Sequence, residues 1–144
     1  MEILNREAKF NYFIEEEIEC GIVLAGTEIK SIRDGKANLK DSYAIIRNNE
    51  VYLLNMHINE YKEGNLFNHD PRRTRKLLLH KSEINKLKKG VLQEGRTLVP
   101  LKLYFVKNKA KILLGLCRGK KSFDKRETIK ERDIEREIAR TNKY

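Results

Sequence analysis

The stretch Gly26-Thr27-Glu28-Ile29-Lys30-Ser31-Ile32-Arg33, followed at once by Asp34-Gly35-Lys36, is the starting point for the fold. Its side chains alternate between two sides, with Thr27 and Ile29 on one and Glu28 and Lys30 on the other. A period of two predicts a strand with one half-buried face. Asp34-Gly35 predicts a tight turn, because glycine accepts the positive φ that such a turn needs. We therefore expect a strand that ends in a reversal.

The outward side of this strand carries an unusual set of charges. Glu28 and Lys30 share it, and Arg33 follows closely. A carboxylate beside two cations is compatible with an ordinary solvated strand face. It is equally compatible with a polar surface that offers an acceptor and donors to a nucleic acid. Local spacing leaves both interpretations open.

Composition narrows the class of partner. The chain has 144 residues, of which 40% are hydrophobic and 36% charged, and its net charge is +10. This charge predicts a polyanionic partner, with nucleic acid as the first candidate and an anionic membrane surface as the second. The longest apolar clusters are far shorter than the ~18 residues of a membrane span. The first residues lack the apolar core of a signal peptide, so we expect a single cytoplasmic domain.

The rest of the chain predicts a small, mostly antiparallel β-barrel. Alternating segments predict further strands, and one helix is expected from an N-cap at Ser82 to a stop at Gly95. The turn Asn48-Asn49-Glu50 predicts a hairpin, and a second turn is expected at Lys107-Asn108-Lys109 between the last two strands. Gly21 predicts a bend or bulge, and Pro100 an edge or a bulge. The absence of a βαβ rhythm also favours a barrel. The expected strands cover residues 8–15, 18–24, 42–47, 51–56, 77–79, 101–106 and 112–116.

The reactive side chains favour a binding module over an enzyme. Cys20 and Cys117 stand alone in apolar segments, which predicts small buried core residues and no zinc site. His57 and His80 fall in strand patterns and are expected to be structural. His69 lies in a long loop beside the run of basic residues, so it is the histidine that we assign to RNA contact. No nucleophile elbow or phosphate loop is visible.

The basic run at Arg72-Arg73-Thr74-Arg75-Lys76 is the second candidate contact surface. In an extended segment Arg73 and Arg75 point the same way, with guanidinium groups about 7 Å apart, close to one phosphate step. The alternative is a solvated charged face.

The last part of the chain looks different from the rest. From Gly119 onward there is little apolar surface to bury, and attractive and repulsive helical pairs nearly cancel. We expect a barrel domain over residues 1–118 and a basic tail over residues 119–144. The tail is expected to be disordered in the free protein and helical only on a partner.

Four ordered blocks together resemble the SsrA-binding protein family, whose members partner transfer-messenger RNA in bacterial ribosome rescue. The resemblance spans essentially the whole chain and implies an oligonucleotide-binding (OB)-type barrel with peripheral helices, no enzymatic activity and no cofactor or metal. The blocks are Gly26 to Lys36 continuing to Tyr43, Asn68 to His80, Thr97 to Lys102, and Gly119 to Arg126.

The same resemblance implies two sets of contact residues. Phe123 stands where the family usually has His or Tyr, so this side chain can stack on a base but cannot donate a hydrogen bond. The residues carried over for binding the RNA are Glu28, Lys30, Ser31, Arg33, Asn38, His69, Arg73, Arg75 and Lys76. Those carried over for the ribosomal decoding centre are Gly119, Lys120, Lys121, Phe123, Asp124, Lys125 and Arg126.

The implied function is that of an RNA-binding adaptor. It would bind the transfer-RNA-like part of transfer-messenger RNA and help to deliver it to stalled ribosomes for trans-translation. The implied partners are that RNA, elongation factor Tu through the RNA complex, and small-subunit ribosomal RNA, with a monomer in solution and no membrane. The alternatives are a generic ribosome-associated OB-fold protein, a constitutive ribosomal structural protein, or a nuclease on a similar barrel.

Overall fold

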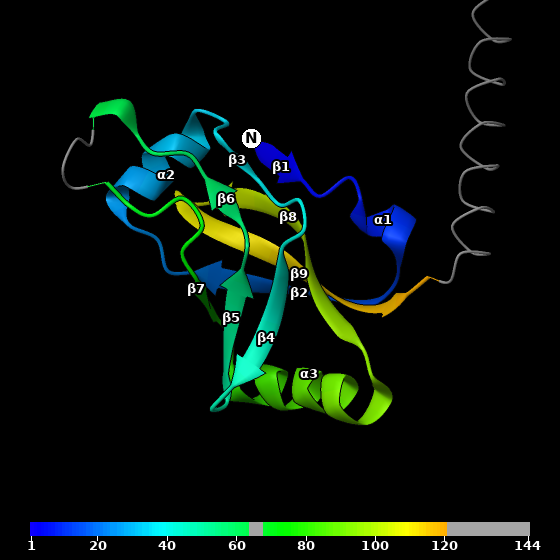
Figure 1. The fold of residues 1–144 in the computed structure, drawn as a ribbon. Helices are drawn as coiled ribbons and strands as arrows, with labels where there is room; N and C mark the ends of the chain where they lie inside the picture. Colours follow the sequence, from blue (N-terminus) through cyan, green and yellow to red (C-terminus); the bar gives the residue numbers. More distant parts are fainter. Residues whose placement is uncertain (64–67, 121–144) are drawn as a thin grey trace, which may run out of the picture.

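The computed structural model describes residues 1–63 and 68–120, and every structural statement below concerns these residues (Figure 1). The helices are α1 (Ala8–Asn11), α2 (Gly26–Arg33) and α3 (Lys81–Glu94). The strands are β1 (Glu2–Leu4), β2 (Tyr12–Ile22), β3 (Ala37–Asn38), β4 (Tyr43–Arg47), β5 (Glu50–Leu54), β6 (His57–Ile58), β7 (Arg75–Leu78), β8 (Thr97–Val106) and β9 (Lys109–Gly119).

Six of the described strands close into a ring. Their order is β8, β4, β5, β7, β2 and β9, and β9 pairs back onto β8. All of these pairs are antiparallel. β1 adds to β8 outside the ring, and β3 pairs with β6 separately. The prediction of a small antiparallel barrel with peripheral helices is confirmed.

The hairpin predictions are confirmed as well. Asn48 and Asn49 join β4 to β5 with φ of 53° and 59°, a left-handed pair that Asn tolerates. Lys107 and Asn108 join β8 to β9 in the same way, with φ of 49° and 66°. Pro100 lies at a register shift of the β8–β9 ladder, as its missing N–H predicts.

The strand predicted over residues 26–33 is wrong, because this stretch is helix α2. The Glu28 carboxylate accepts the backbone N–H of Ala25 at 2.8 Å and so satisfies a free donor at the helix start. The buried residues are Glu28, Ser31 and Ile32, at the spacing of three and four that marks one helical face. Two of these three are polar, so an apolar period could not show the helix.

The first strand also differs from its prediction. Ala8–Asn11 form a single helical turn, and β2 begins only at Tyr12. β2 then continues through three consecutive glutamates to Ile22, because a long ladder with β9 holds that segment extended. The irregularity lies between Ile14 and Glu16, and not at Gly21 as predicted.

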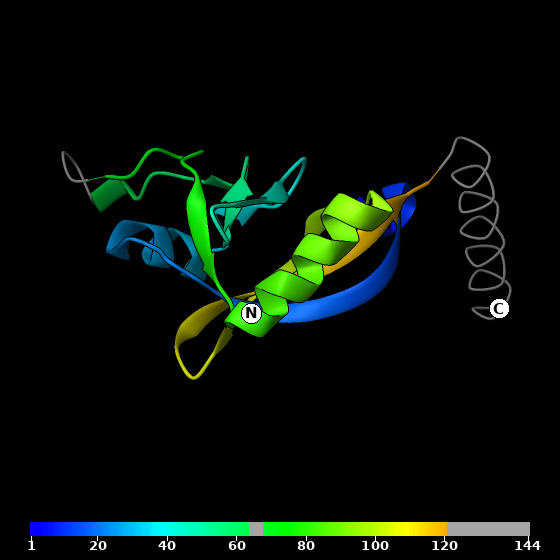
Figure 2. The same ribbon diagram turned by 90° about the horizontal axis from the view of Figure 1, so that it is seen from below.

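Helices α2 and α3 lie at opposite ends of the barrel (Figures 1 and 2). α3 begins after His80, two residues earlier than the predicted N-cap, and Glu83 accepts the His80 N–H at 2.8 Å. It ends at Gly95 as predicted, with φ of 66°. Its inner face packs Ile84 and Leu87 into the barrel core. Cys20 and Cys117 are buried free thiols, as predicted.

Candidate nucleic-acid interface

Glu28 lies at the centre of a buried ion cluster, and not on an outward face. Its Oε1 accepts hydrogen bonds from Arg73 Nε at 3.0 Å and Nη2 at 2.5 Å, and its Oε2 accepts one from Arg75 Nε at 2.5 Å. The side chains of Glu28 and Arg75 are 0% exposed, whereas Arg73 retains 34%. Arg73 and Arg75 do point the same way, but towards a carboxylate.

Both arginines also donate to backbone carbonyls. Arg75 donates to the carbonyls of Met56 at 2.6 Å and Pro71 at 3.1 Å. Arg73 donates from Nη2 to the carbonyl of Val23 at 3.1 Å. The cluster therefore ties α2 to the end of β2 and to the loop before β7.

The cluster keeps Glu28 ionised. Burial alone raises the pKa of this carboxyl, but hydrogen bonds from Arg73, the Ala25 amide and Arg75 outweigh that effect and hold the pKa below its ordinary value. Arg75 remains a cation despite its burial, because guanidinium groups stay protonated far above neutral pH. A buried charge is tolerated only when it is paired and hydrogen-bonded, and the Glu28 carboxylate meets both conditions.

Four of the predicted RNA contacts are buried in the free protein and bonded to other parts of it. Glu28 and Arg75 are fully covered, and the Ser31 hydroxyl donates to the carbonyl of Asn59 at 2.7 Å. His69 is 8% exposed. Its Nε2 donates to the carbonyl of Ile58 at 3.0 Å, and its Nδ1 lies 2.9 Å from the Thr27 hydroxyl oxygen. These contacts leave none of the four directed at a partner.

Three other predicted contacts stay on the surface near α2. Lys30 Nζ lies 5.5 Å from the centroid of the Tyr61 ring, and the Arg33 guanidinium lies 4.4 Å from that of Phe105. Aromatic faces attract cations, so these rings hold both charges in place without removing them from water. Asn38 is exposed on β3. Lys30, Arg33 and Asn38 thus remain available to a partner.

Lys76 belongs to a different surface. It follows Arg75 in β7, so its side chain points out of the barrel where that of Arg75 points in. Lys76 Nζ lies 2.9 Å from the Glu50 carboxylate, which also accepts from the Tyr52 hydroxyl at 2.6 Å. The ion pair leaves about two-fifths of each side chain exposed, 41% for Lys76 and 42% for Glu50. The predicted basic cluster is thereby divided between two sides of the barrel wall.

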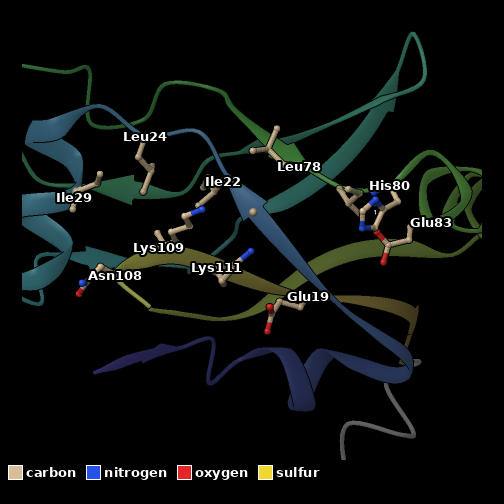
Figure 3. A pocket seen from close by; sticks show the side chains of 13 residues that line it. Glu19, Ile22, Leu24, Ile29, Leu78, His80, Glu83, Asn108, Lys109 and Lys111 are labelled. Atoms are coloured by element: carbon tan, nitrogen blue, oxygen red, sulfur yellow. Dashed lines mark hydrogen bonds between the residues drawn. The ribbon is translucent and has the colours of Figure 1, made fainter. Parts of the chain in front are cut away.

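A hollow of about 650 Å³ beside the ion cluster is the surface that sequence reasoning missed. Figure 3 shows aliphatic side chains from β2, β7 and α2 along it, together with Lys109 and Lys111 from β9 and Glu19 from β2. Leu78 is 51% exposed and so adds apolar surface to the hollow. The lining residues are Glu19, Gly21, Ile22, Leu24, Ile29, Leu78, Leu79, His80, Glu83, Asn108, Lys109, Ala110 and Lys111.

Strand pairing explains how this hollow forms. Gly21 pairs with Leu78 on one side and with Lys111 on the other. A Cβ at residue 21 would come within 3.2 Å of the Leu78 Cβ, so glycine permits the close approach. The lining comes from three strands, a hairpin tip and two helices. No local pattern could have assembled it.

Arg73 is bonded to the segment that borders the hollow. Arg73 donates to the carbonyl of Val23, which stands between the lining residues Ile22 and Leu24. Exposed cations beside apolar surface fit a folded RNA, which offers phosphates, 2′-hydroxyls and unstacked bases. We call Arg73, Leu78, Lys109 and Lys111, with the acceptor Glu19, the RNA face.

Over residues 1–63 and 68–120, no His, Cys, Asp and Glu side chains gather in a group that could hold a metal ion. None of the helices described there has the length and apolar character to cross a membrane.

Comparison with known proteins adds the following matches. A family model described as SmpB protein matches residues 2–144. An SsrA-binding protein of Desulfitobacterium hafniense is 60% identical over 136 residues, covering 94% of this chain and 87% of that protein. One of Staphylococcus aureus is 59% identical over 139 residues, covering 96% and 90%. A solved structure described as "tmRNA-SmpB: a journey to the center of the bacterial ribosome" contains a chain with a TM-score of 0.72 and 48% identity, covering 89% and 94%.

Proposed function

Because the chain belongs to the SmpB family, we propose that it is a non-enzymatic adaptor that binds transfer-messenger RNA (SsrA). It recognises the transfer-RNA-like part of that RNA and delivers it to stalled ribosomes, where trans-translation tags the incomplete peptide. The observation that carries this proposal is the 60% identity to an SsrA-binding protein over 94% of the chain.

The RNA face supplies the contacts for this binding. Arg73, Lys109 and Lys111 neutralise phosphates, and Leu78 offers apolar surface to a base or a sugar. Lys30, Arg33 and Asn38 extend the same contact along α2 and β3. Glu28 acts from behind this surface, because it fixes the orientation of Arg73.

The remaining partners follow from the same proposal. Elongation factor Tu joins through the RNA, and the tail block from Gly119 to Arg126 contacts small-subunit RNA at the decoding centre. Of that block, Gly119 and Lys120 are described, whereas Lys121, Phe123, Asp124, Lys125 and Arg126 lie outside the described residues. The protein acts as a monomer, which analytical ultracentrifugation would check.

Binding to the transfer-RNA-like domain at several salt concentrations tests the RNA face. Each lost phosphate contact lowers the slope of log K against log salt by about 0.7–0.9. Lys109→Gln with Lys111→Gln should therefore lower the slope by about 1.4–1.8. The control is Lys86→Gln on α3. The Nζ of Lys86 lies 3.5 Å from the Glu16 carboxylate, and Lys86 is not among the residues that line the hollow. An unchanged slope in the double variant would exclude this face.

A second measurement tests identity of the RNA. RNA that co-purifies with the protein from cells should be enriched in transfer-messenger RNA when it is sequenced. Recovery of ribosomal RNA without enrichment of transfer-messenger RNA would favour a general ribosome-associated protein instead. Such a protein would also occupy stalled and translating ribosomes equally.

A further inference from the structure

The last described residues of the chain are held against the barrel by an aromatic ring. Phe13 in β2 and Arg118 in β9 are cross-strand partners, and the guanidinium lies 4.5 Å from the ring centroid. Lys120 is two residues further on, a diagonal neighbour on the same side of the ladder. Its Nζ lies 4.8 Å from the same ring. One ring therefore contacts two cations that flank Gly119.

Backbone contacts hold the same point. The ladder pairs Tyr12 with Gly119, and the Lys120 N–H then donates to the carbonyl of Asn11 at 2.9 Å. Lys120 Nζ also donates to the carbonyl of Lys9 in α1 at 2.8 Å. The end of a ladder ordinarily frays, because its final pairs are stabilised from one side only. Here two hydrogen bonds and two cation–π contacts oppose fraying.

The position of this exit matters for the proposed function. Figures 1 and 2 both place α2 and the end of β9 at opposite sides of the barrel. The barrel therefore sets the distance between RNA bound beside α2 and the start of the tail after Lys120. Any fraying of residues 118–120 would lengthen the connection and lower the effective concentration of the tail at its target.

We propose that Phe13, Arg118 and Lys120 form an exit anchor that fixes where the tail leaves the barrel, and that Phe13 is a positioning residue for tail-dependent activity. This inference rests on the proposed function for its physiological meaning. Its structural part, the clamping of residue 120 against α1 and β2, stands on the contacts above. Phe13 touches neither RNA nor the ribosome in this role.

Amide hydrogen exchange in the full-length free protein tests the clamp. Loss of two exposed cation–π contacts in Phe13→Leu should speed exchange of the Lys120 amide about tenfold. The amide of Leu116, deeper in the same strand, should exchange at the wild-type rate. Phe13→Tyr keeps the ring and should restore protection at Lys120. Unchanged exchange at Lys120 in Phe13→Leu would overturn the anchor.

Peptide tagging in a reconstituted translation system tests whether the exit anchor supports the activity of the tail. Phe13→Leu should lower the rate of tagging severalfold while the Kd for the transfer-RNA-like domain stays at its wild-type value, and Phe13→Tyr should tag normally. A parallel loss of RNA affinity would make Phe13 an RNA contact and overturn the positioning role. Normal tagging by Phe13→Leu, in spite of faster exchange at the Lys120 amide, would also overturn the positioning role. If the wild-type protein itself supported no tagging, the proposed function would fall, and exchange alone would then decide the anchor.

Discussion

At the scale of single residues, the buried carboxylate of Glu28 shows why a charged pattern can mislead. Glu28 and Arg75 carry formal charges, so their sequence context suggests surface contacts. Both are fully buried, and each satisfies the other together with backbone groups. The cost of taking these charges from water is offset only while every partner is present. Arg73 is the one member of the cluster with exposed surface, so we expect Glu28 to influence RNA binding only through Arg73.

Glu28→Gln is therefore predicted to destabilise the fold. The amide keeps the shape but leaves the buried Arg75 guanidinium without its counter-charge, a loss worth about 3–5 kcal/mol for a buried pair. Urea denaturation would measure it. Glu50→Gln, which removes the exposed partner of Lys76, should leave the midpoint unchanged. Equal midpoints for the two variants would contradict a structural role for Glu28.

The pH dependence of stability should carry the same signature. The folded pKa of Glu28 lies below its ordinary value of 4.5. Its contribution to stability is thus fully present above that value and is lost as the pH falls through the folded pKa. The gap in unfolding free energy between wild type and Glu28→Gln should accordingly shrink as the pH falls below about 4.5. Urea titrations across this range would reveal a constant gap if Glu28 titrated normally in the folded protein.

At the scale of secondary-structure elements, local chemistry decided what could be predicted. The Asn48-Asn49 turn and the alternation in β8 and β9 follow from neighbouring residues, so both hairpins were predicted correctly. Helix α2 was not, because its buried face includes Glu28 and Ser31, whose partners are up to 47 residues away in the sequence. The lining of the hollow depends on pairing between strands distant in sequence. Local residue patterns do not indicate contacts between residues that are distant in the sequence.

Helix α3 offers a test of packing against propensity. Glycine within a helix costs about 1 kcal/mol relative to alanine, so sequence alone predicts that Gly90→Ala stabilises the protein. A Cβ at residue 90 would lie 2.8 Å from the Leu116 Cδ2 in the core. Overpacking costs about 1–3 kcal/mol, so we expect net destabilisation by about 1 kcal/mol.

Two further variants separate these effects in thermal denaturation. Leu116→Val in the Gly90→Ala background should recover part of the lost stability, because it removes the atoms that collide. Gly26→Ala in α2, where nothing lies within 4 Å of the added Cβ, should be neutral or stabilising. A higher melting temperature for Gly90→Ala alone would show that α3 moves freely on the barrel.

At the scale of the whole molecule, we expect the chain to combine a closed barrel with a tail block that depends on other molecules. The main core of the barrel draws on all six strands of the ring, and a smaller cluster packs Val99 and Cys117 against Ala8. Beyond Lys120 the sequence supplies few apolar residues, chiefly Phe123, Ile129, Ile134 and Ile138. A segment with so little to bury gains stable structure only against a partner's surface. The division near residue 119 is therefore a prediction about function as well as folding.

Deletion of residues 121–144 should separate RNA binding from peptide tagging. The barrel and the RNA face lie outside the deleted part, so the melting temperature and the Kd for the transfer-RNA-like domain should stay near wild type. Tagging on stalled ribosomes should be abolished. Phe123→Ala should reproduce part of the defect, because stacking on a base is worth about 1–3 kcal/mol. Phe123→Tyr keeps the ring and should be tolerated.

A scrambled tail of identical composition distinguishes specific contacts from charge. Residues 121–144 carry both signs of charge, so a tether that acted only through net charge would be indifferent to their order. A tail that presents Phe123 and a helical register to ribosomal RNA requires that order. Tagging should therefore be lost with the scramble while RNA affinity is kept. Full tagging by the scrambled protein would mean that neither Phe123 nor the helical register carries the function, and the exit anchor would then have no ordered segment to position.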